Sequence, residues 1–191
     1  MRVTGGVFRS RELRAPKGTH TRPTSDRVRE ALFSILGARG VFDEPCRVLD
    51  LYAGTGALGL EALSRGASHA TFVEPDRAAL SALSANVDAL KVRDQVTVLG
   101  CAVASALASV RRGPPVDLIF ADPPYALVPT GEVGRALEGY APLLSHYGVL
   151  VLEHAEGDAP PPLPGLALVS TRRYGDTSVT LYEAAKDGSM P

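Results

Sequence analysis

The sequence predicts an α/β fold with a mostly parallel, seven-stranded sheet and an antiparallel edge strand. Between residues 47 and 153, short apolar runs alternate with segments of helical periodicity, which is typical of strand–helix–strand units with right-handed crossovers. The last two strand-like segments, 166–172 and 178–184, are joined by the short turn Tyr174–Asp176 and must be antiparallel to each other. Helices should then cover both faces of the sheet.

Length and composition are those of one globular domain. The 191 residues are 45% hydrophobic and 21% charged, with a net charge of −1, so the overall charge neither favours nor excludes a nucleic-acid partner. No stretch has the pattern of an export signal or a membrane span. Cys46 and Cys101 stand apart within apolar runs, as reduced core thiols do. We expect a cytoplasmic monomer without a metal or a membrane partner.

Residues 1–23 are expected to form a basic N-terminal arm. Residues 1–29 contain eight Arg and Lys residues but only two acids, and a local excess of this kind suits a phosphate backbone. A short hairpin is predicted from Val3 to Leu13. The alternative is a solvated tail without a function. The arginines expected to contact RNA phosphates are Arg9, Arg11, Arg14 and Arg22.

The main domain is predicted to span residues 24–185, with a frayed tail at 186–191. Its first helix should begin with Thr24 as the N-cap and end at Gly37 or Gly40, because apolar residues between them recur at helical spacing. The next elements follow in alternation: strand 47–53, helix 57–65, strand 69–73, helix 76–90, strand 95–99, helix 102–110, strand 116–121, helix 131–144, strand 148–153 and a proline-rich loop, 158–165.

A glycine-rich turn connects the first strand to the helix that follows it. Gly54, Gly56 and Gly59 match the G-x-G-x-x-G pattern of a dinucleotide site, which alone leaves a nicotinamide-dependent oxidoreductase and a methyltransferase open. Glu74 ends the next strand, where a carboxylate can accept hydrogen bonds from both hydroxyls of a ribose. In a methyltransferase, Asp50 would lie near the ammonium end of S-adenosylmethionine.

A second motif follows the buried strand Val116–Ala121 and so lies at its carboxyl end, where open parallel sheets bind ligands. It consists of Asp122, Pro123, Pro124 and Tyr125, and the two prolines stiffen the turn and remove backbone donors. The Asp122 carboxylate and the Pro123 carbonyl can each accept one N–H of an exocyclic amine while Tyr125 stacks on the ring. A hydride-transfer enzyme has no use for this set, so the two motifs together favour an amine methyltransferase.

Three segments of the sequence closely resemble the RsmD family of bacterial 16S ribosomal RNA guanine-N2 methyltransferases: Arg22–Phe33, Leu49–Ala67 and Asp122–Tyr125. The resemblance covers nearly the whole chain. It implies a Rossmann-like class I methyltransferase fold, S-adenosylmethionine as the cofactor, and one guanosine of 16S rRNA in the 30S subunit as the substrate. The Asp-Pro-Pro-Tyr motif is shared with DNA adenine enzymes and indicates the chemistry only, whereas the segment beginning at Arg22 points to this family.

The resemblance also implies the site residues. Asp122, Pro123 and Tyr125 would hold the base during catalysis. Where the family usually has Asp or Asn, this chain has Cys101; because a thiol is a poor acceptor, we expect backbone groups around Cys101 and Ala102 to recognise the adenine. By position, the cofactor would be lined by Asp50, Tyr52, Ala53, Gly54, Gly56, Glu74, Pro75, Asp76, Cys101 and Ala102.

We expect Asp122 to orient the amine rather than to act as a base before methyl transfer. A covalent intermediate would need a cysteine in the base pocket, and neither cysteine follows the strand 116–121. Two alternatives stay open besides the oxidoreductase. A DNA adenine-N6 methyltransferase is disfavoured because the chain leaves no room for a separate target-recognition domain, and a non-catalytic RNA-binding assembly factor would keep the fold without needing Asp122.

Overall fold

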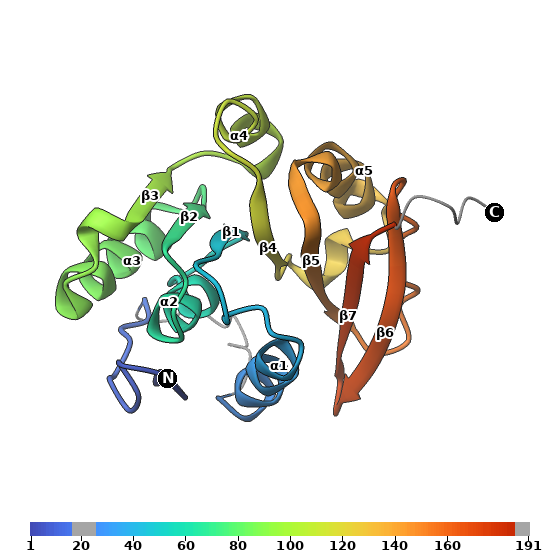
Figure 1. The fold of residues 1–191 in the computed structure, drawn as a ribbon. Helices are drawn as coiled ribbons and strands as arrows, with labels where there is room; N and C mark the ends of the chain where they lie inside the picture. Colours follow the sequence, from blue (N-terminus) through green and yellow to red (C-terminus); the bar gives the residue numbers. More distant parts are fainter. Residues whose placement is uncertain (17–25, 186–191) are drawn as a thin grey trace.

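Seven strands form one mixed sheet in the computed structural model, which describes residues 1–16 and 26–185 (Figure 1). The strand order is β3-β2-β1-β4-β5-β7-β6. Strands β1 to β5 run parallel, and β7 is antiparallel to both of its neighbours. This confirms the predicted fold class. The bounds are β1 (Arg47–Leu51), β2 (His69–Val73), β3 (Val96–Leu99), β4 (Val116–Ala121), β5 (Leu144–Ala155), β6 (Leu166–Tyr174) and β7 (Thr177–Ala184).

Helices cover both faces of the sheet. In Figure 1, α1, α2 and α3 lie on one face, and α4 and α5 lie on the other. No helix in the described part of the chain is long and apolar enough to cross a membrane. The bounds are α1 (Asp26–Ala38), α2 (Ala57–Ser64), α3 (Arg77–Leu90), α4 (Val103–Val110) and α5 (Glu132–Tyr140), with the short 3-10 helices η1 (Arg93–Gln95), η2 (Tyr125–Leu127) and η3 (Ala141–Leu143).

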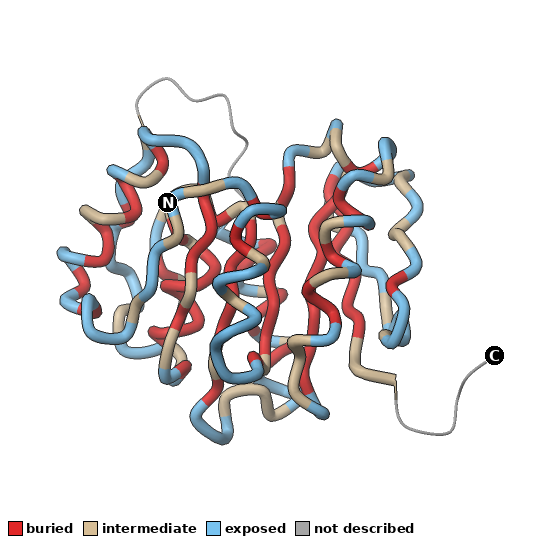
Figure 2. Tube along the Cα trace, turned by 90° about the horizontal axis from the view of Figure 1, so that it is seen from above, coloured by how far each residue is buried: buried red, intermediate tan, exposed pale blue. Residues whose placement is uncertain are grey.

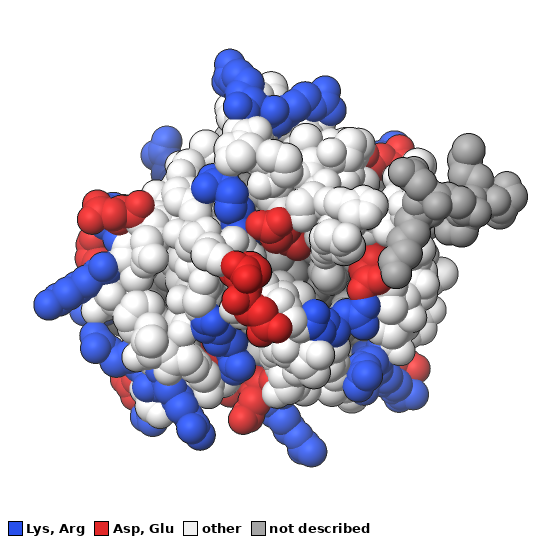
Figure 3. Space-filling model, viewed as in Figure 1, with Lys and Arg blue, Asp and Glu red and all other residues white. Residues whose placement is uncertain are grey.

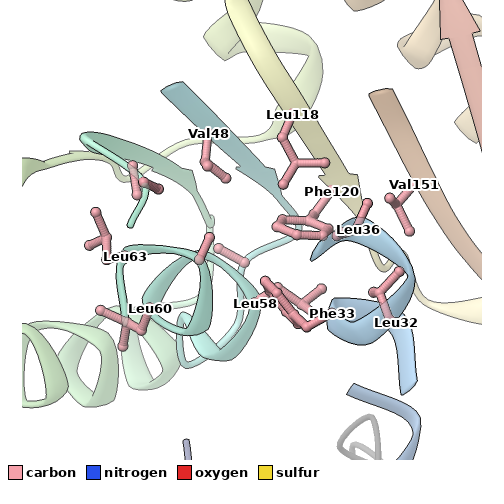
Figure 4. Packing of buried hydrophobic residues seen from close by; sticks show 14 of the residues in the cluster. Leu32, Phe33, Leu36, Val48, Leu58, Leu60, Leu63, Leu118, Phe120 and Val151 are labelled. Carbon is pink, nitrogen blue, oxygen red and sulfur yellow. The ribbon is translucent and has the colours of Figure 1, made fainter. Parts of the chain in front are cut away.

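Two apolar layers hold the helices to the sheet, because neighbouring residues of a strand point to opposite faces. Phe120 of β4 points to α1, where its ring centroid lies 5.5 Å from that of Phe33, beside Leu36 (Figure 4). Ile119 belongs to the other layer, which includes Leu137 of α5. These side chains are fully buried, and Figure 2 shows burial concentrated along the strands. Each such side chain contributes roughly 1.5–3 kcal/mol to stability.

The main departure from the predicted elements lies between α5 and β5. The sequence predicted a helix over 131–144 and a strand over 148–153, whereas α5 ends at Tyr140 and β5 begins at Leu144. Pro142 lies between them in η3, and an α-helix does not continue through a proline because the residue has no N–H and its ring clashes with the preceding turn. β5 is therefore longer than predicted. The other predicted helices and strands are present, with small differences in their ends.

The N-terminal hairpin is packed against the domain instead of extending from it. Arg2 and Glu12 form an antiparallel bridge, which confirms the predicted hairpin. Val3 and Leu13 are buried in the same apolar layer as α1 and α2, so the hairpin belongs to the folded core. Four predictions lie outside the described residues: Arg22 as an RNA contact, the end of the arm at residue 23, Thr24 as an N-cap, and the tail 186–191.

Glu61 of α2 ties this hairpin to the domain. Its side chain is completely buried, and its carboxylate accepts hydrogen bonds from Thr4 N at 2.6 Å, Thr4 Oγ1 at 2.7 Å and Gly5 N at 2.8 Å. Arg65 Nε lies 2.8 Å away and the buried Arg29 Nε lies 3.5 Å away. Because a buried charge is costly unless it is paired and hydrogen-bonded, this set of donors makes the docking of the hairpin, α1 and α2 interdependent.

Replacing Glu61 should therefore destabilise the protein strongly. We expect Glu61→Ala to lower the free energy of unfolding by about 3–5 kcal/mol, because it removes the buried carboxylate that faces Arg29 Nε and accepts from the N–H groups of Thr4 and Gly5. The matched control is Glu12→Ala, which removes the exposed Arg2–Glu12 pair and should cost no more than about 1 kcal/mol. Urea denaturation of both variants measures the difference, and equal losses would contradict the assignment.

Candidate active site

The carboxyl ends of the five parallel strands meet at one edge of the sheet. Leu51 pairs with Val73 on one side and with Ala121 on the other, and the alignment continues to Leu99 and Leu152. The strand order reverses between β1 and β4, because the chain continues from β1 to β2 and β3 on one side and returns to β4 on the other. Doubly wound sheets bind their ligands at such a reversal. The residues at this edge are the glycine turn, Glu74, Cys101, Asp122 and Glu153, so the main predicted site residues lie together.

The glycine turn after β1 has backbone conformations that favour glycine at two positions. Gly54 has φ +54° and Gly56 has φ +80°, a region that favours glycine. A Cβ on Gly56 would also lie 2.3 Å from Leu83 Cδ1, whereas a Cβ on Gly54 would have no atom within 4 Å. Gly54 therefore faces open space, and a ligand can approach its backbone closely.

Glu74 fastens this turn to the end of β2. The residue is 8% exposed, and its Oε2 accepts from Gly54 N while its Oε1 accepts from Asp76 N, both at 2.8 Å. A carboxylate has about four lone-pair sites, so these two bonds leave Glu74 the capacity to accept from ribose hydroxyls as well. The position at the strand end fits the predicted ribose contact.

Asp50 and Asp76 have structural partners that the sequence did not indicate. Asp76 is the N-cap of α3 and accepts from Ala79 N at 2.8 Å. Asp50 is 1% exposed and its Oδ2 accepts from Gly59 N at 2.9 Å, so it lies beneath α2 and supports the glycine turn. One oxygen of Asp50 is thus engaged in the turn, and its expected contact with the cofactor's ammonium group stays a prediction.

The predicted adenine end of the site lies after β3. Cys101 is half-buried and Ala102 is exposed at the N-cap of α4, where no side chain caps the helix. The first N–H groups of a helix have no intrahelical acceptor, so backbone donors are available next to Cys101. Tyr140 braces this helix from α5, since its hydroxyl donates to the Val103 carbonyl at 2.6 Å. The geometry agrees with recognition through backbone groups.

The Asp-Pro-Pro-Tyr turn is held in a fixed shape by η2. Pro123 is buried and Asp122 is half-buried. The Pro124 carbonyl accepts from Leu127 N at 2.9 Å, so this carbonyl is engaged in the turn. Among the described residues, no hydrogen bond is found to the Pro123 carbonyl. Of the two proline carbonyls, the predicted acceptor is thus the one that remains available to a substrate.

The Tyr125 hydroxyl is anchored by two residues that the sequence analysis missed. It donates to Glu153 Oε1 at 3.0 Å and lies 2.7 Å from Thr177 Oγ1. Burial, together with the nearby Glu153 and Asp122 carboxylates, raises the pKa of Tyr125, so the phenol keeps its proton. Ala121 of β4 pairs with Leu152 of β5, and Asp122 and Glu153 are the residues that follow them. This shared position was a signal that could have identified Glu153.

The predicted RNA-binding arginines lie on the N-terminal hairpin. Arg9, Arg11 and Arg14 are exposed, although Arg11 Nη2 also donates to the Ala89 carbonyl. Buried Asn86 of α3 joins this hairpin to the glycine turn, because it accepts from Arg14 N at 2.7 Å and donates to the Thr55 carbonyl at 3.0 Å. The hairpin is thus connected to the site edge. Arg22 lies outside the described residues.

Charge is not gathered into one basic surface on the face drawn in Figure 3. Acidic side chains lie near the centre of that face, and Lys and Arg side chains lie mostly around its border. A hollow of about 520 Å³ lies at the opposite, amino-terminal edge of the sheet, beside Cys46, Asp117 and Tyr147. It contains none of the predicted site residues. The chemistry of the strand ends, rather than the size of that hollow, identifies the candidate active site.

This sheet order, with an antiparallel β7, a glycine turn after β1 and an acid at the end of β2, defines a class I methyltransferase. The cofactor of this class is S-adenosylmethionine. The open space at Gly54 and the remaining acceptor capacity of Glu74 fit that cofactor.

The chain belongs to the RsmD family: the family profile described as Conserved hypothetical protein 95 matches residues 1–183. It is 37% identical over 188 residues to ribosomal RNA small subunit methyltransferase D of Escherichia coli K12, covering 98% of this chain and 92% of that protein. The solved structure of a hypothetical protein of Thermus thermophilus superposes with a TM-score of 0.80 at 32% identity, covering 96% of this chain and 99% of that one.

The buried Asp50 should make stability depend on pH. Burial, with a smaller contribution from Glu74, raises the pKa of Asp50 from the usual 3.8 to about 8. The folded protein therefore holds this proton between about pH 4 and pH 8 while the unfolded chain loses it, so the free energy of unfolding should fall as pH rises through that range. Asp50→Asn keeps an acceptor for Gly59 N but cannot ionise. Urea denaturation at pH 5 and pH 8 should show a smaller difference for this variant, and an unchanged difference would contradict the assignment.

Proposed function

We propose that this protein transfers a methyl group from S-adenosylmethionine to the exocyclic N2 amine of a guanosine in 16S rRNA of the small ribosomal subunit. The observation that carries the proposal is the position of Asp122 and the Pro123 carbonyl at the same sheet edge as the glycine turn. Two acceptors and an aromatic ring beside a cofactor turn suit a planar base that carries an NH2 group. The name of the Escherichia coli relative supports small-subunit rRNA as the target.

The cofactor would be held by groups on both sides of β1. Glu74 would accept from the ribose hydroxyls of the cofactor, and backbone N–H groups near Cys101 and Ala102 would donate to its adenine. Gly54, which has no side chain, would let the cofactor approach the backbone of the turn closely. Tyr52, Ala53, Gly56 and Pro75 complete the predicted lining. Asp50 and Asp76 belong to the same predicted lining, and they also hold the turn and α3 in place.

The base would be flipped out of the RNA and stacked on Tyr125, an interaction worth roughly 1–3 kcal/mol. S-adenosylmethionine supplies a methyl group on a sulfonium, which is already an activated leaving group. Asp122 and Pro123 orient the N2 lone pair toward that methyl, and such positioning can lower the barrier by about 7–11 kcal/mol. The N2 proton would become labile only once the methyl has arrived, and the Asp122 carboxylate that accepts its hydrogen bond would then take it.

Replacing Asp122 tests this function directly. We expect Asp122→Ala to lower methyl transfer at least about 100-fold, because a misplaced reacting atom loses that much. Asp122→Asn keeps one carbonyl oxygen as an acceptor and should retain more activity than the alanine variant if Asp122 orients the amine rather than removing a proton first. The measurement is transfer of labelled methyl to 30S particles that lack the modification, and to protein-free rRNA, followed by nucleoside analysis.

Label in N2-methylguanosine that disappears in Asp122→Ala would support the reaction and the role of Asp122. Label in another nucleoside would keep methyl transfer and exclude the guanine-N2 assignment. Methylation of DNA adenine instead of RNA would favour the alternative DNA enzyme. A native protein that binds the RNA but transfers no methyl group, and whose RNA binding is the same in Asp122→Ala, would favour an assembly factor.

The hairpin arginines should contribute through salt-sensitive phosphate contacts. Because each lost contact lowers the slope of log K against log salt by about 0.7–0.9, the double variant Arg9→Gln, Arg14→Gln should lower it by about 1.4–1.8. The matched control is Arg112→Gln, Arg135→Gln, which removes two exposed arginines near α4 and α5. Filter binding of rRNA across a salt series measures both slopes. Equal slopes for the two double variants would show that the hairpin does not hold the RNA.

A further inference from the structure

Glu153 lies beside Asp122 at the edge where the base would bind. Strands β4 and β5 run parallel with Ala121 opposite Leu152, so the next residues, Asp122 and Glu153, emerge at the same level on strands roughly 4.8 Å apart. Side chains alternate along a strand, and the residues two positions earlier both belong to the apolar layer beneath α1 and α2. The two carboxylates therefore point to the same face.

Glu153 is buried, and its contact with Tyr125 brings it to the base site. It is 6% exposed, and its Oε1 accepts a hydrogen bond from the Tyr125 hydroxyl at 3.0 Å. Because the single O–H of the phenol is directed at this carboxylate, the Thr177 hydroxyl, at 2.7 Å, serves as a donor to the phenol oxygen. A carboxylate has about four lone-pair sites, so Glu153 can accept from more than one donor.

The neighbouring acceptors match one kind of base edge. The Watson–Crick edge of guanine presents a ring N1–H next to the N2 amine, so it offers donors to both carboxylates. Adenine presents an amine next to N1, which is an acceptor. Enzymes that flip a base read it through hydrogen bonds to this edge, and a buried acceptor that faces another acceptor stays unpaired at a cost of about 1–3 kcal/mol.

We propose that Glu153 is a specificity-determining residue: it accepts the ring N1–H of the flipped guanine while Asp122 accepts from the N2 amine. This inference rests on the proposed function and adds to it the reason why guanine is chosen. Asp122 and Pro123 alone would accept any exocyclic amine. Glu153 supplies the second acceptor that adenine, and any other base without a donor at N1, cannot satisfy.

The test uses a base that keeps the reacting 2-amino group but has a hydrogen-bond acceptor at N1, where guanine has a donor. 2,6-Diaminopurine carries the same 2-amino group as guanine but has an acceptor at N1. The substrate is 16S rRNA in which the methylated guanosine, once mapped, is replaced by 2,6-diaminopurine through splinted ligation, used free or reconstituted into 30S particles according to which form is methylated. For the native protein, we expect kcat/KM on this RNA to be about 10- to 100-fold lower than on the guanosine RNA.

Glu153→Gln should change that preference. The glutamine amide oxygen can still accept from Tyr125, while its NH2 group can donate to N1 of 2,6-diaminopurine, so the ratio of kcat/KM for guanosine over diaminopurine should fall at least about 10-fold. The matched control is Thr177→Val, which removes the other partner of the phenol. It should lower both rates in proportion and leave the ratio unchanged. Calorimetric binding of S-adenosylmethionine shows whether each variant is folded.

Each outcome decides a different claim. A native protein that methylates both RNAs at equal rates would overturn the role of Glu153, and this comparison needs no variant that might fail to fold. A folded Glu153→Gln variant with the native ratio would reduce Glu153 to a positioning residue for Tyr125. A native protein that forms no N2-methylguanosine at all would instead refute the proposed function.

Discussion

The register of the five parallel strands is the constraint on which the candidate site depends. Leu51, Val73, Leu99, Ala121 and Leu152 lie at one level across the sheet, so every residue that follows a strand emerges at the same edge. A shift of one residue in β4 would turn Asp122 to the opposite face. The two apolar layers maintain this register, because Phe120 and Ile119 are buried on opposite faces of the same strand.

The site edge is stiffened by carboxylates that bind backbone N–H groups. Glu74 holds Gly54, and Asp50 holds Gly59 at the start of α2. These bonds are intramolecular and already formed before a ligand arrives, so little conformational freedom remains to be lost on binding. Asn86 extends the same principle to the N-terminal hairpin through Thr55. Cofactor turn and hairpin are thus parts of one hydrogen-bonded unit.

Acids at this edge have different tasks because their surroundings differ. Asp50 is enclosed under α2, where its raised pKa suits a supporting role. Asp122 is half-buried in a stiff turn, where it and the Pro123 carbonyl would both accept from the substrate amine. Glu153 is buried but connected to Tyr125 at the base site. Their positions, rather than their side-chain chemistry, separate the supporting role of Asp50 from the substrate contacts that we propose for Asp122 and Glu153.

The sequence by itself determined the α/β class, the glycine turn, the position of Glu74 at the end of β2 and the Asp-Pro-Pro-Tyr turn. These features follow from local periodicity and from residues that fix the backbone, so neighbours in the chain suffice to predict them. The end of α5 was signalled locally by Pro142, whereas the burial of Asp50 and the partners of Tyr125 did not follow from the sequence. Tyr125 lies 52 residues from Thr177, and Thr4 lies 57 residues from Glu61. Such pairs are decided only by the tertiary structure, because the packing and register that bring distant strand ends and helices together leave no periodic signal in the local sequence.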